Sequence, residues 1–218
     1  MERTIYHGSE FIVEKPEYHK GSKYNDYGYG FYCCSSKQLG REWAARKTGS
    51  GFLNTYIIRD DNLKILDLTK PPYDNVLYWI ALLVHNRVLP TDVIENCSRE
   101  IKYLKDNYLI NAEDWDIIIG YRADDAYFHF PEAFVNSAIT LESLNTVFKA
   151  GDLGKQYVLI SKHAFSLIRF VGFEEVGEEH RVSYYNRKKE ADKVFSDLLE
   201  KDRYSSGTRM RDFVMDHE

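Results

Sequence analysis

The spacing of apolar residues changes twice along this chain, and this change limits the folds that the chain can adopt. Before about Asp74, short apolar runs alternate with turn-forming residues, as is typical of strands, and the pattern returns at "WDIIIGYR". Between Asp74 and about Leu109, "NVLYWIALLVHNRVL" is apolar on most sides and "TDVIENCSREIKYLKDNY" is amphipathic, so both predict helices. Helices grouped between two strand-forming halves predict an α+β fold.

The remaining patterns extend this prediction to the whole chain. Further strands are predicted in "TIYHGS", "YGFYCC", "GFLNTYIIRD", "LKILDL" and "KQYVLIS". Helices are predicted in "SSKQLGREWAARK", in "PEAFVNSAITLESLNTVFKAG" and in "SKHAFSLIRFVGF", the last followed by a short strand. Two charged or amphipathic helices should follow from Asn186 onward. We therefore expect one domain over residues 1–185, with a helical insert at about 74–109, and a C-terminal helical extension over 186–218 packed on it.

Composition narrows the kind of protein. The 218 residues are 44% hydrophobic, which is enough for a core, and the net charge of -5 gives no general attraction to nucleic acid or to an anionic membrane, although a local patch could still bind nucleic acid. The longest apolar run has about half the length needed to span a bilayer, and the first residues lack a signal-peptide core. The three cysteines have neither disulfide nor metal-ligand spacing. We expect a cytoplasmic protein with no metal site and no membrane partner.

Several common catalytic motifs are absent from the sequence. It contains no P-loop, no HExxH and no G-x-S-x-G. The stretch "YGYG" contains G-x-G but lacks the third glycine and the strand–helix context of a dinucleotide-binding fingerprint. The absence of these motifs argues against several large enzyme classes.

Three separated stretches carry residues that could form a ligand site. In "YHGS", the ring nitrogens of His7 can hydrogen-bond ribose hydroxyls, and the backbone of Gly8 can pair with a carboxamide. In "NDYGYGFYCCSS", Tyr32 lies on a strand, and Trp43 follows on the next helix, so two rings could sandwich a planar heteroaromatic group. In "QYVLIS", Gln156 leads an apolar strand. Taken alone, each stretch is better explained without a ligand, as a capped strand, as core aromatics or as a strand-end amide.

Taken together, these stretches resemble the ADP-ribosyltransferase superfamily, in particular the poly(ADP-ribose) polymerase-like branch with its His–Tyr–Glu triad. The motifs "YHGS", "YGYGFYCCSS", "IIIGYRADDAYF", "QYVLIS" and "RMRDFVMD" are similar to those of a bacterial domain family of unknown function within that clan. The likeness runs from Thr4 to about Asp216. It implies a split β-sheet whose cleft binds NAD as co-substrate, with a helical insert and C-terminal helices.

The resemblance also implies roles for individual residues. His7 would hydrogen-bond the adenosine-side ribose, and Gly8, with Ser9 beside it, would hold the nicotinamide carboxamide. Tyr32 would stack on the nicotinamide, and Trp43 would cover its other face.

The catalytic position departs from the pattern of the family. Gln156 stands where the polymerase-like enzymes carry the catalytic glutamate, and a register with Val158 at that position also lacks a carboxylate. A carboxylate would stabilise the oxocarbenium character that develops when the nicotinamide–ribose bond breaks, whereas the amide of Gln156 carries no charge. Gly40 replaces a serine that would bind the carboxamide.

A loop after a buried strand offers another source of charge. "GYRADDAYFHF" contains Arg122, Asp124 and Asp125. One aspartate could supply the charge that Gln156 lacks, and Arg122 could hold a pyrophosphate. The same residues also fit an Asx-type turn with solvated acids.

The sequence therefore supports two hypotheses about function. The first is an NAD-dependent mono-ADP-ribosyltransferase that modifies an unidentified macromolecule, either protein or nucleic acid, with plain NAD hydrolysis as a variant. Some members of the similar family are encoded beside small antitoxin-like proteins, so the resemblance implies a toxin with such a partner. The second hypothesis is a non-catalytic module of the same fold that binds NAD or another ADP-containing nucleotide.

Overall fold

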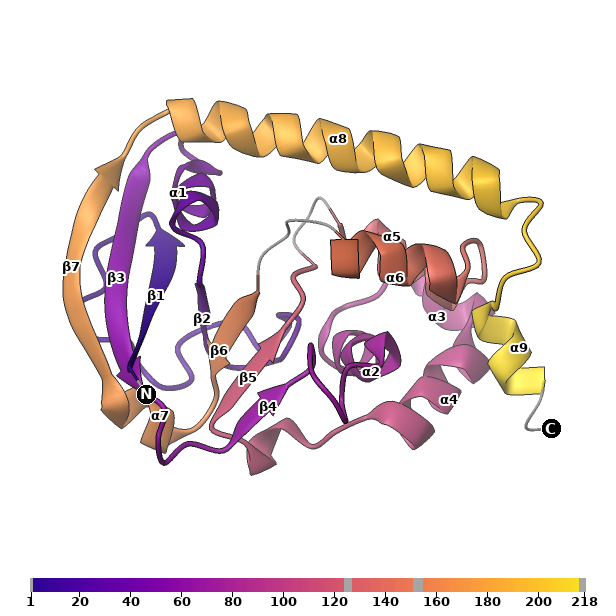
Figure 1. The fold of residues 1–218 in the computed structure, drawn as a ribbon, viewed down its shortest axis with the longest axis horizontal. Coiled ribbons are helices and arrows are strands. Elements are labelled where there is room, and N and C mark those ends of the chain that lie inside the picture. Colours follow the sequence, from indigo (N-terminus) through magenta and orange to yellow (C-terminus); the bar gives the residue numbers. More distant parts are fainter. Residues whose placement is uncertain (1, 124–126, 151–154, 216–218) are drawn as a thin grey trace.

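The structure is a computed structural model that describes residues 2–123, 127–150 and 155–215. It has an α+β fold, as the sequence predicts. One seven-stranded mixed sheet lies beside a lobe of helices, and a long helix, α8 (Glu179–Asp202), runs across both (Figure 1). This helix has 24 residues but carries many charges, and the apolar helix α2 (Val76–Asn86) has 11 residues. In the part of the chain described, no helix combines the length and apolarity needed to cross a membrane.

The sheet has the order β4-β5-β6-β2-β1-β3-β7. Strands β4 and β5 are parallel, and all other neighbouring strands are antiparallel. The strands are β1 (Glu2–Ser9), β2 (Phe31–Cys34), β3 (Gly51–Arg59), β4 (Ile65–Asp67), β5 (Ile117–Gly120), β6 (Gln156–Leu159) and β7 (Ile168–Val176).

The sheet consists of two halves that are joined by very little backbone pairing. Strand β1 pairs with β3 along its whole length, from Glu2 to Ser9. On its other edge, β1 pairs with β2 through one residue pair, Tyr6 opposite Cys34. Continuing that register would set Gly8 opposite Tyr32, but the strands do not pair there. The seam between β1 and β2 is therefore the place where this sheet opens.

The segment predicted as a helical insert, residues 74–109, is helical and contains three helices where the sequence predicts two. It holds the apolar α2, which is buried almost all round, and the more exposed α3 and α4. The other helices of the described residues lie before and after it. The helices are α1 (Lys37–Ala45), α2, α3 (Thr91–Asn96), α4 (Ser98–Tyr108), α5 (His129–Val135), α6 (Leu141–Ala150), α7 (Lys162–Leu167), α8 and α9 (Met210–Met215).

Four elements differ from their predicted extent. The amphipathic helix predicted from Thr91 is two helices, α3 and α4, separated at Cys97. The single helix predicted after Pro131 is two helices, α5 and α6, because the chain turns at Ser137, which has a φ of 63°. Strand β7 has nine residues rather than a short run, because it pairs along most of β3. Helix α8 begins at Glu179, so the boundary predicted at residue 186 falls inside a continuous helix.

Helix α8 is fastened to both parts of the molecule. Near its start, Arg187 Nε pairs with Glu42 Oε2 of α1 at 2.9 Å, and both side chains are largely buried. At its end, the buried carboxylate of Asp202 accepts hydrogen bonds from Thr140 N at 2.7 Å and from Ser143 Oγ at 2.9 Å. The helix therefore connects α1, which covers the sheet, to α6 in the helical lobe.

Helix α1 packs very closely on β1, and two glycines make this possible. A Cβ atom on Gly8 would lie 2.1 Å from the carbonyl oxygen of Gly40 and 2.7 Å from the backbone nitrogen of Ala44. A Cβ atom on Gly40 would lie 2.4 Å from Leu53 Cδ1. Strand–helix packing therefore requires glycine at position 8, in addition to any role of its backbone toward a ligand. A serine at position 40, which the resemblance implies, would require the side chain of Leu53 to move.

This packing leads to a prediction about stability. Gly8→Ala places a methyl group against the backbone of α1, which cannot move aside as a flexible side chain can. We expect the substitution to lower the free energy of unfolding by about 1–3 kcal/mol, measured by urea denaturation. Gly172→Ala in β7 is the matched control, because nothing lies within 4 Å of the added Cβ atom. A Gly8→Ala variant as stable as the control would contradict the close approach of β1 and α1.

Candidate functional site

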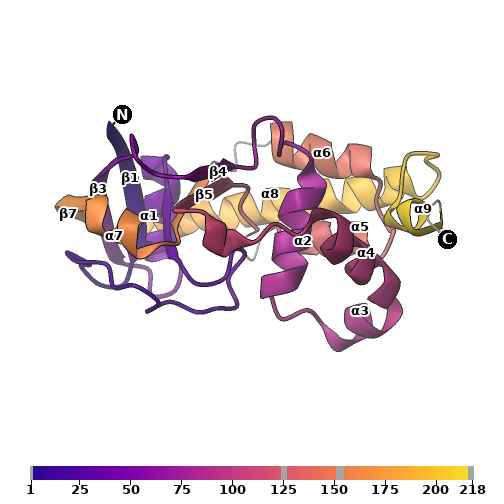
Figure 2. The same ribbon diagram turned by 90° about the horizontal axis from the view of Figure 1, so that it is seen from below.

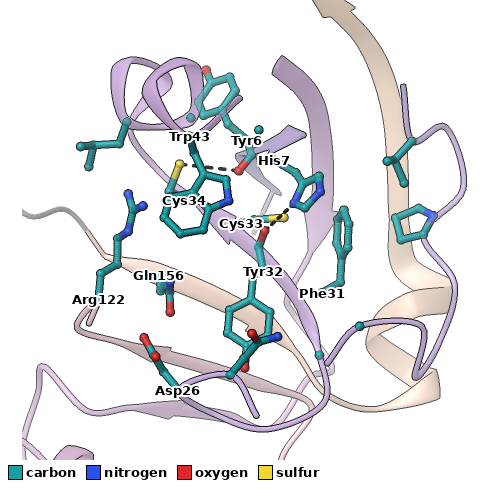
Figure 3. Close-up of a pocket in the computed structure, with 18 of the residues that line it drawn as sticks. Tyr6, His7, Asp26, Phe31, Tyr32, Cys33, Cys34, Trp43, Arg122 and Gln156 are labelled. Carbon is teal, nitrogen blue, oxygen red and sulfur yellow. Dashed lines mark hydrogen bonds between the residues drawn. The ribbon is translucent and has the colours of Figure 1, made fainter. Parts of the chain in front are cut away.

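A cavity of about 370 Å³ follows the seam between β1 and β2 (Figure 3). Its lining includes the consecutive residues Tyr6, His7 and Gly8 of β1 and all four residues of β2. Successive side chains of a strand point to opposite faces of a sheet. Consecutive residues can line one cavity only if it runs between the strands rather than over one face. The cavity volume lies within the range of small-molecule sites.

His7 bridges the seam through its side chain. Its Nδ1 lies 2.7 Å from the carbonyl oxygen of Tyr32. A carbonyl oxygen can only accept, so Nδ1 carries the hydrogen, and Nε2 of the neutral ring is left as an acceptor. Burial lowers the pKa of His7, partly opposed by this hydrogen bond, and so favours the neutral ring. His7 can therefore accept a hydrogen bond from a ligand hydroxyl at Nε2.

Tyr32 closes the loop that precedes it. Its hydroxyl donates to the carbonyl oxygen of Gly28 at 2.7 Å and accepts from the backbone nitrogen of Tyr27 at 3.1 Å. Gly28 has a φ of +75°, a conformation that favours glycine. Burial raises the pKa of Tyr32, so its hydroxyl stays protonated at any physiological pH. The ring lines the cavity in a fixed position.

Trp43 reaches the same cavity from α1. The guanidinium of Arg46 lies 3.8 Å from the centre of its ring, and that of Arg122 lies 5.0 Å from it. Arg122 is 4% exposed and follows β5. These cation–π contacts hold the indole in place and bring a buried positive charge to the cavity.

Gln156 brings an unsatisfied acceptor to the cavity. It is the first residue of β6 and stands between Cys34 of β2 and Gly120 of β5. Its Oε1 is buried and accepts no hydrogen bond within the described structure. A buried amide oxygen without a donor is costly, and such atoms are normally paired. A ligand hydroxyl or N–H in the cavity would satisfy it.

The structure adds a carboxylate that the sequence analysis missed. Asp26 is 3% exposed and lines the cavity, and Figure 3 shows its carboxylate on the side toward Gln156. Its Oδ1 pairs with Arg87 at 2.6 Å, and its Oδ2 accepts from the backbone nitrogen of Ala123 at 3.0 Å. Burial raises the pKa of Asp26, and Arg87 opposes that shift. No local pattern distinguishes Asp26 from an ordinary turn residue, so only its tertiary contacts identify it.

Most of the predicted site residues meet in this one cavity. The structure does not bring Ser9 into the lining, because its hydroxyl donates to the carbonyl oxygen of Phe11 and accepts from Asn54 Nδ2. Asp124 and Asp125 lie outside the described residues. The predicted residues that line the cavity are His7, Gly8, Tyr32, Trp43, Arg122 and Gln156.

A family model matches residues 3–170 of the chain, which is more than three-quarters of its length. The chain belongs to the DUF3990 family. This family is described as a protein of unknown function. No curated protein and no solved structure matches the chain. The match confirms the expected membership of a domain family of unknown function, while the relation to ADP-ribosyltransferases stays a prediction.

The DUF3990 match covers every residue named above as part of the cavity. It ends at residue 170, within β7, so α8 and α9 lie beyond it. The part of the chain that carries the family pattern thus includes the seam, the helical insert and Gln156. The C-terminal helices pack on this part through the contacts of Glu42 and Asp202.

The neutral state of His7 leads to a prediction about pH. Its pKa is lowered on folding, so the unfolded chain binds more protons below about pH 6.5, and the free energy of unfolding should fall as the pH falls through this range. The slope contributed by His7 should reach up to about 1.4 kcal/mol per pH unit. His7→Asn should remove this contribution, as measured by urea denaturation from pH 5 to pH 8.

His129 serves as the parallel case in this experiment. Burial also lowers its pKa, but it lies on α5, outside the cavity. His129→Asn should therefore remove a separate part of the slope. If His7→Asn leaves the slope of the native protein unchanged, His7 is not buried as a neutral ring.

Proposed function

We propose that this protein is an ADP-ribosyltransferase that uses NAD as co-substrate and modifies a macromolecule. The observation that carries the proposal is the cavity at the seam of the sheet, which gathers His7, Tyr32, Trp43 and Gln156 from four different elements. Three of these residues, His7, Tyr32 and Gln156, lie far apart in the sequence and are the positions that resemble the His–Tyr–Glu triad. Their convergence on one cavity supports the proposed split-sheet site.

The cavity residues fit the chemical groups of NAD. The Nε2 atom of His7 can accept a hydrogen bond from a ribose hydroxyl, and the backbone of Gly8, at the end of β1 that does not pair with β2, can hold the carboxamide. The ring of Tyr32 is fixed for stacking on the nicotinamide, and Trp43 lines the same cavity. The buried guanidinium of Arg122 suits a pyrophosphate.

The electrostatics of the cavity bear on its chemistry. In NAD, a glycosidic bond joins the ribose to a positively charged nicotinamide ring. As that bond breaks, the positive charge develops on the ribose. Gln156 Oε1 can accept a hydrogen bond from the ribose 2′-hydroxyl. Asp26 places a negative charge in the same cavity, although Arg87 neutralises part of it. A site that favours positive charge at the ribose favours the transition state over the ground state.

We expect the purified protein to release nicotinamide from NAD. Tyr32→Ala should abolish the release, because the stacking ring and its hold on Gly28 are both lost. Tyr204→Ala is the matched control, since this tyrosine is 84% exposed and lies outside the cavity. The measurement is chromatographic detection of nicotinamide, with thermal unfolding to confirm that both variants fold. If NAD binds but neither nicotinamide release nor labelling of an acceptor occurs, the enzymatic proposal is wrong.

A second function is favoured by the neutral amide of Gln156. Without a free carboxylate at this position, the protein would be a non-catalytic module that binds NAD or another ADP-containing nucleotide. Its Asp26 carboxylate is engaged by Arg87 and Ala123, which weakens its effect on a ligand. Calorimetry with NAD and with ADP-ribose would detect binding without turnover.

The substitution Gln156→Glu separates these two functions. A carboxylate forms a charge-assisted hydrogen bond that is roughly twice as strong as a neutral one, so we expect nicotinamide release to rise by about 10²-fold. Asn107→Asp adds a negative charge on the exposed surface of α4 and should leave the rate unchanged. A lower rate in Gln156→Glu would show that the native site depends on the amide itself.

A further inference from the structure

A second, larger hollow lies beside the cavity of the proposed active site. This groove measures about 940 Å³ and is lined by residues of the β1–β2 connection, the end of α2, the segment before β5 and the start of α7. Figure 2 shows the β1–β2 connection, in indigo and purple, between α7 and α2. The groove and the seam cavity have no lining residue in common.

One loop separates the two hollows. Residues 16–30, which we call the wall loop, contribute to both linings. Lys20, Gly21 and Asp26 face the seam cavity, whereas Lys23 and Tyr29 face the groove. A molecule that lies in the groove is therefore separated from the proposed NAD site by the thickness of one loop.

The wall loop presents stacked rings to the groove. His19 is stacked between Tyr18 and Tyr29, with ring centres 3.9 Å and 4.7 Å apart. Its backbone φ is 60°, a conformation that costs free energy in a residue other than glycine. Tyr29 and Tyr24 are 40% and 52% exposed. A strained loop that keeps large rings exposed on a concave surface offers a stacking platform rather than a core.

Positive charges accompany the rings. Lys23 Nζ lies 5.1 Å from the ring centre of Tyr24, and Lys162 Nζ lies 5.5 Å from that of Tyr18. The charged side chains of the groove lining are these two lysines and Glu113, together with the imidazoles of His19 and His85. With the histidines neutral, the two lysines and Glu113 give the groove lining a formal charge of +1, whereas the chain carries a net charge of -5.

We propose that this groove binds single-stranded nucleic acid. Aromatic rings that stack on bases, placed beside cations that contact phosphates, are the combination by which proteins hold unpaired strands. A duplex keeps its bases stacked inside and cannot offer their faces to Tyr24 and Tyr29. A peptide has neither bases to stack on the exposed tyrosines nor a phosphate backbone for the lysines.

The identity of the acceptor rests on the proposed function. For a protein that transfers ADP-ribose, the groove makes single-stranded nucleic acid the macromolecule that is modified. In the transfer, the bond between ribose C1′ and the nicotinamide nitrogen breaks, and nicotinamide leaves as a neutral molecule with the bonding electron pair. A nucleophilic nitrogen or oxygen of the nucleic acid forms the new bond to C1′ and releases its proton to solvent. The reaction needs no oxidant or reductant.

Binding is tested first, without NAD, by fluorescence anisotropy of labelled 12-nucleotide single-stranded RNA and DNA. We expect both to bind more tightly than a duplex of the same sequence. Tyr29→Ala should weaken binding about ten-fold through the loss of one stacked base, while the remote Tyr204→Ala should not. Lys23→Ala should reduce the dependence of log Kd on log salt by roughly 0.7.

Transfer is tested second, with NAD that carries a label on its adenosine half. Label on the oligonucleotide, lost in Tyr29→Ala and kept in Tyr204→Ala, would support the groove as the acceptor site. The inference would be overturned if no oligonucleotide binds at low salt or if single strand and duplex bind equally. It would also be overturned if the label appears on protein instead of nucleic acid. Binding that persists when no nicotinamide is released would refute the proposed enzymatic function and leave the binding groove standing.

Discussion

The hydrogen bond from His7 to the carbonyl oxygen of Tyr32 is the contact on which the site depends. Strands β1 and β2 pair through Tyr6 and Cys34 alone, so the sheet would have little to hold its two halves together at this point. The ring of His7 bridges the halves beyond that pair at 2.7 Å. A side chain thus joins the strands where backbone pairing stops, and the space between them stays open as a cavity. Because the ring is neutral and uses Nδ1 for this contact, Nε2 stays available to a ligand.

The wall loop depends in turn on the helical insert. Arg87 follows α2 and donates to Asp26 Oδ1 at 2.7 Å and to the carbonyl oxygen of Ala123 at 2.6 Å. Asn86 of α2 also donates to the backbone carbonyl of Asp26 at 3.3 Å. The insert therefore fixes the loop that separates the seam cavity from the groove. This gives a structural role to helices that interrupt the strand-forming halves of the chain.

The charges of the cavity are arranged differently from the His–Tyr–Glu pattern that the sequence resembles. A catalytic glutamate at position 156 would be a carboxylate on a strand, facing the ligand directly. Here the strand carries an amide, and the buried carboxylate of Asp26 comes from the loop on the other side, tied to Arg87. A buried ion pair is costly to break, because removal of one partner leaves an uncompensated charge. Asp26 thus holds the loop in place as well as giving the cavity its charge.

The sequence by itself determined the α+β class, the helical insert and the positions of most strands, because apolar periodicity and turn residues act locally. It also singled out His7, Tyr32 and Gln156, because the stretches that carry them, taken together, resemble the motifs of one superfamily. The tertiary structure alone decided the rest. The length of β7 follows from its pairing with β3, and the continuity of α8 from its anchors at Glu42 and Asp202. The cavity carboxylate of Asp26 and the groove beyond the wall loop arise from contacts between segments far apart in the chain, which no local pattern encodes.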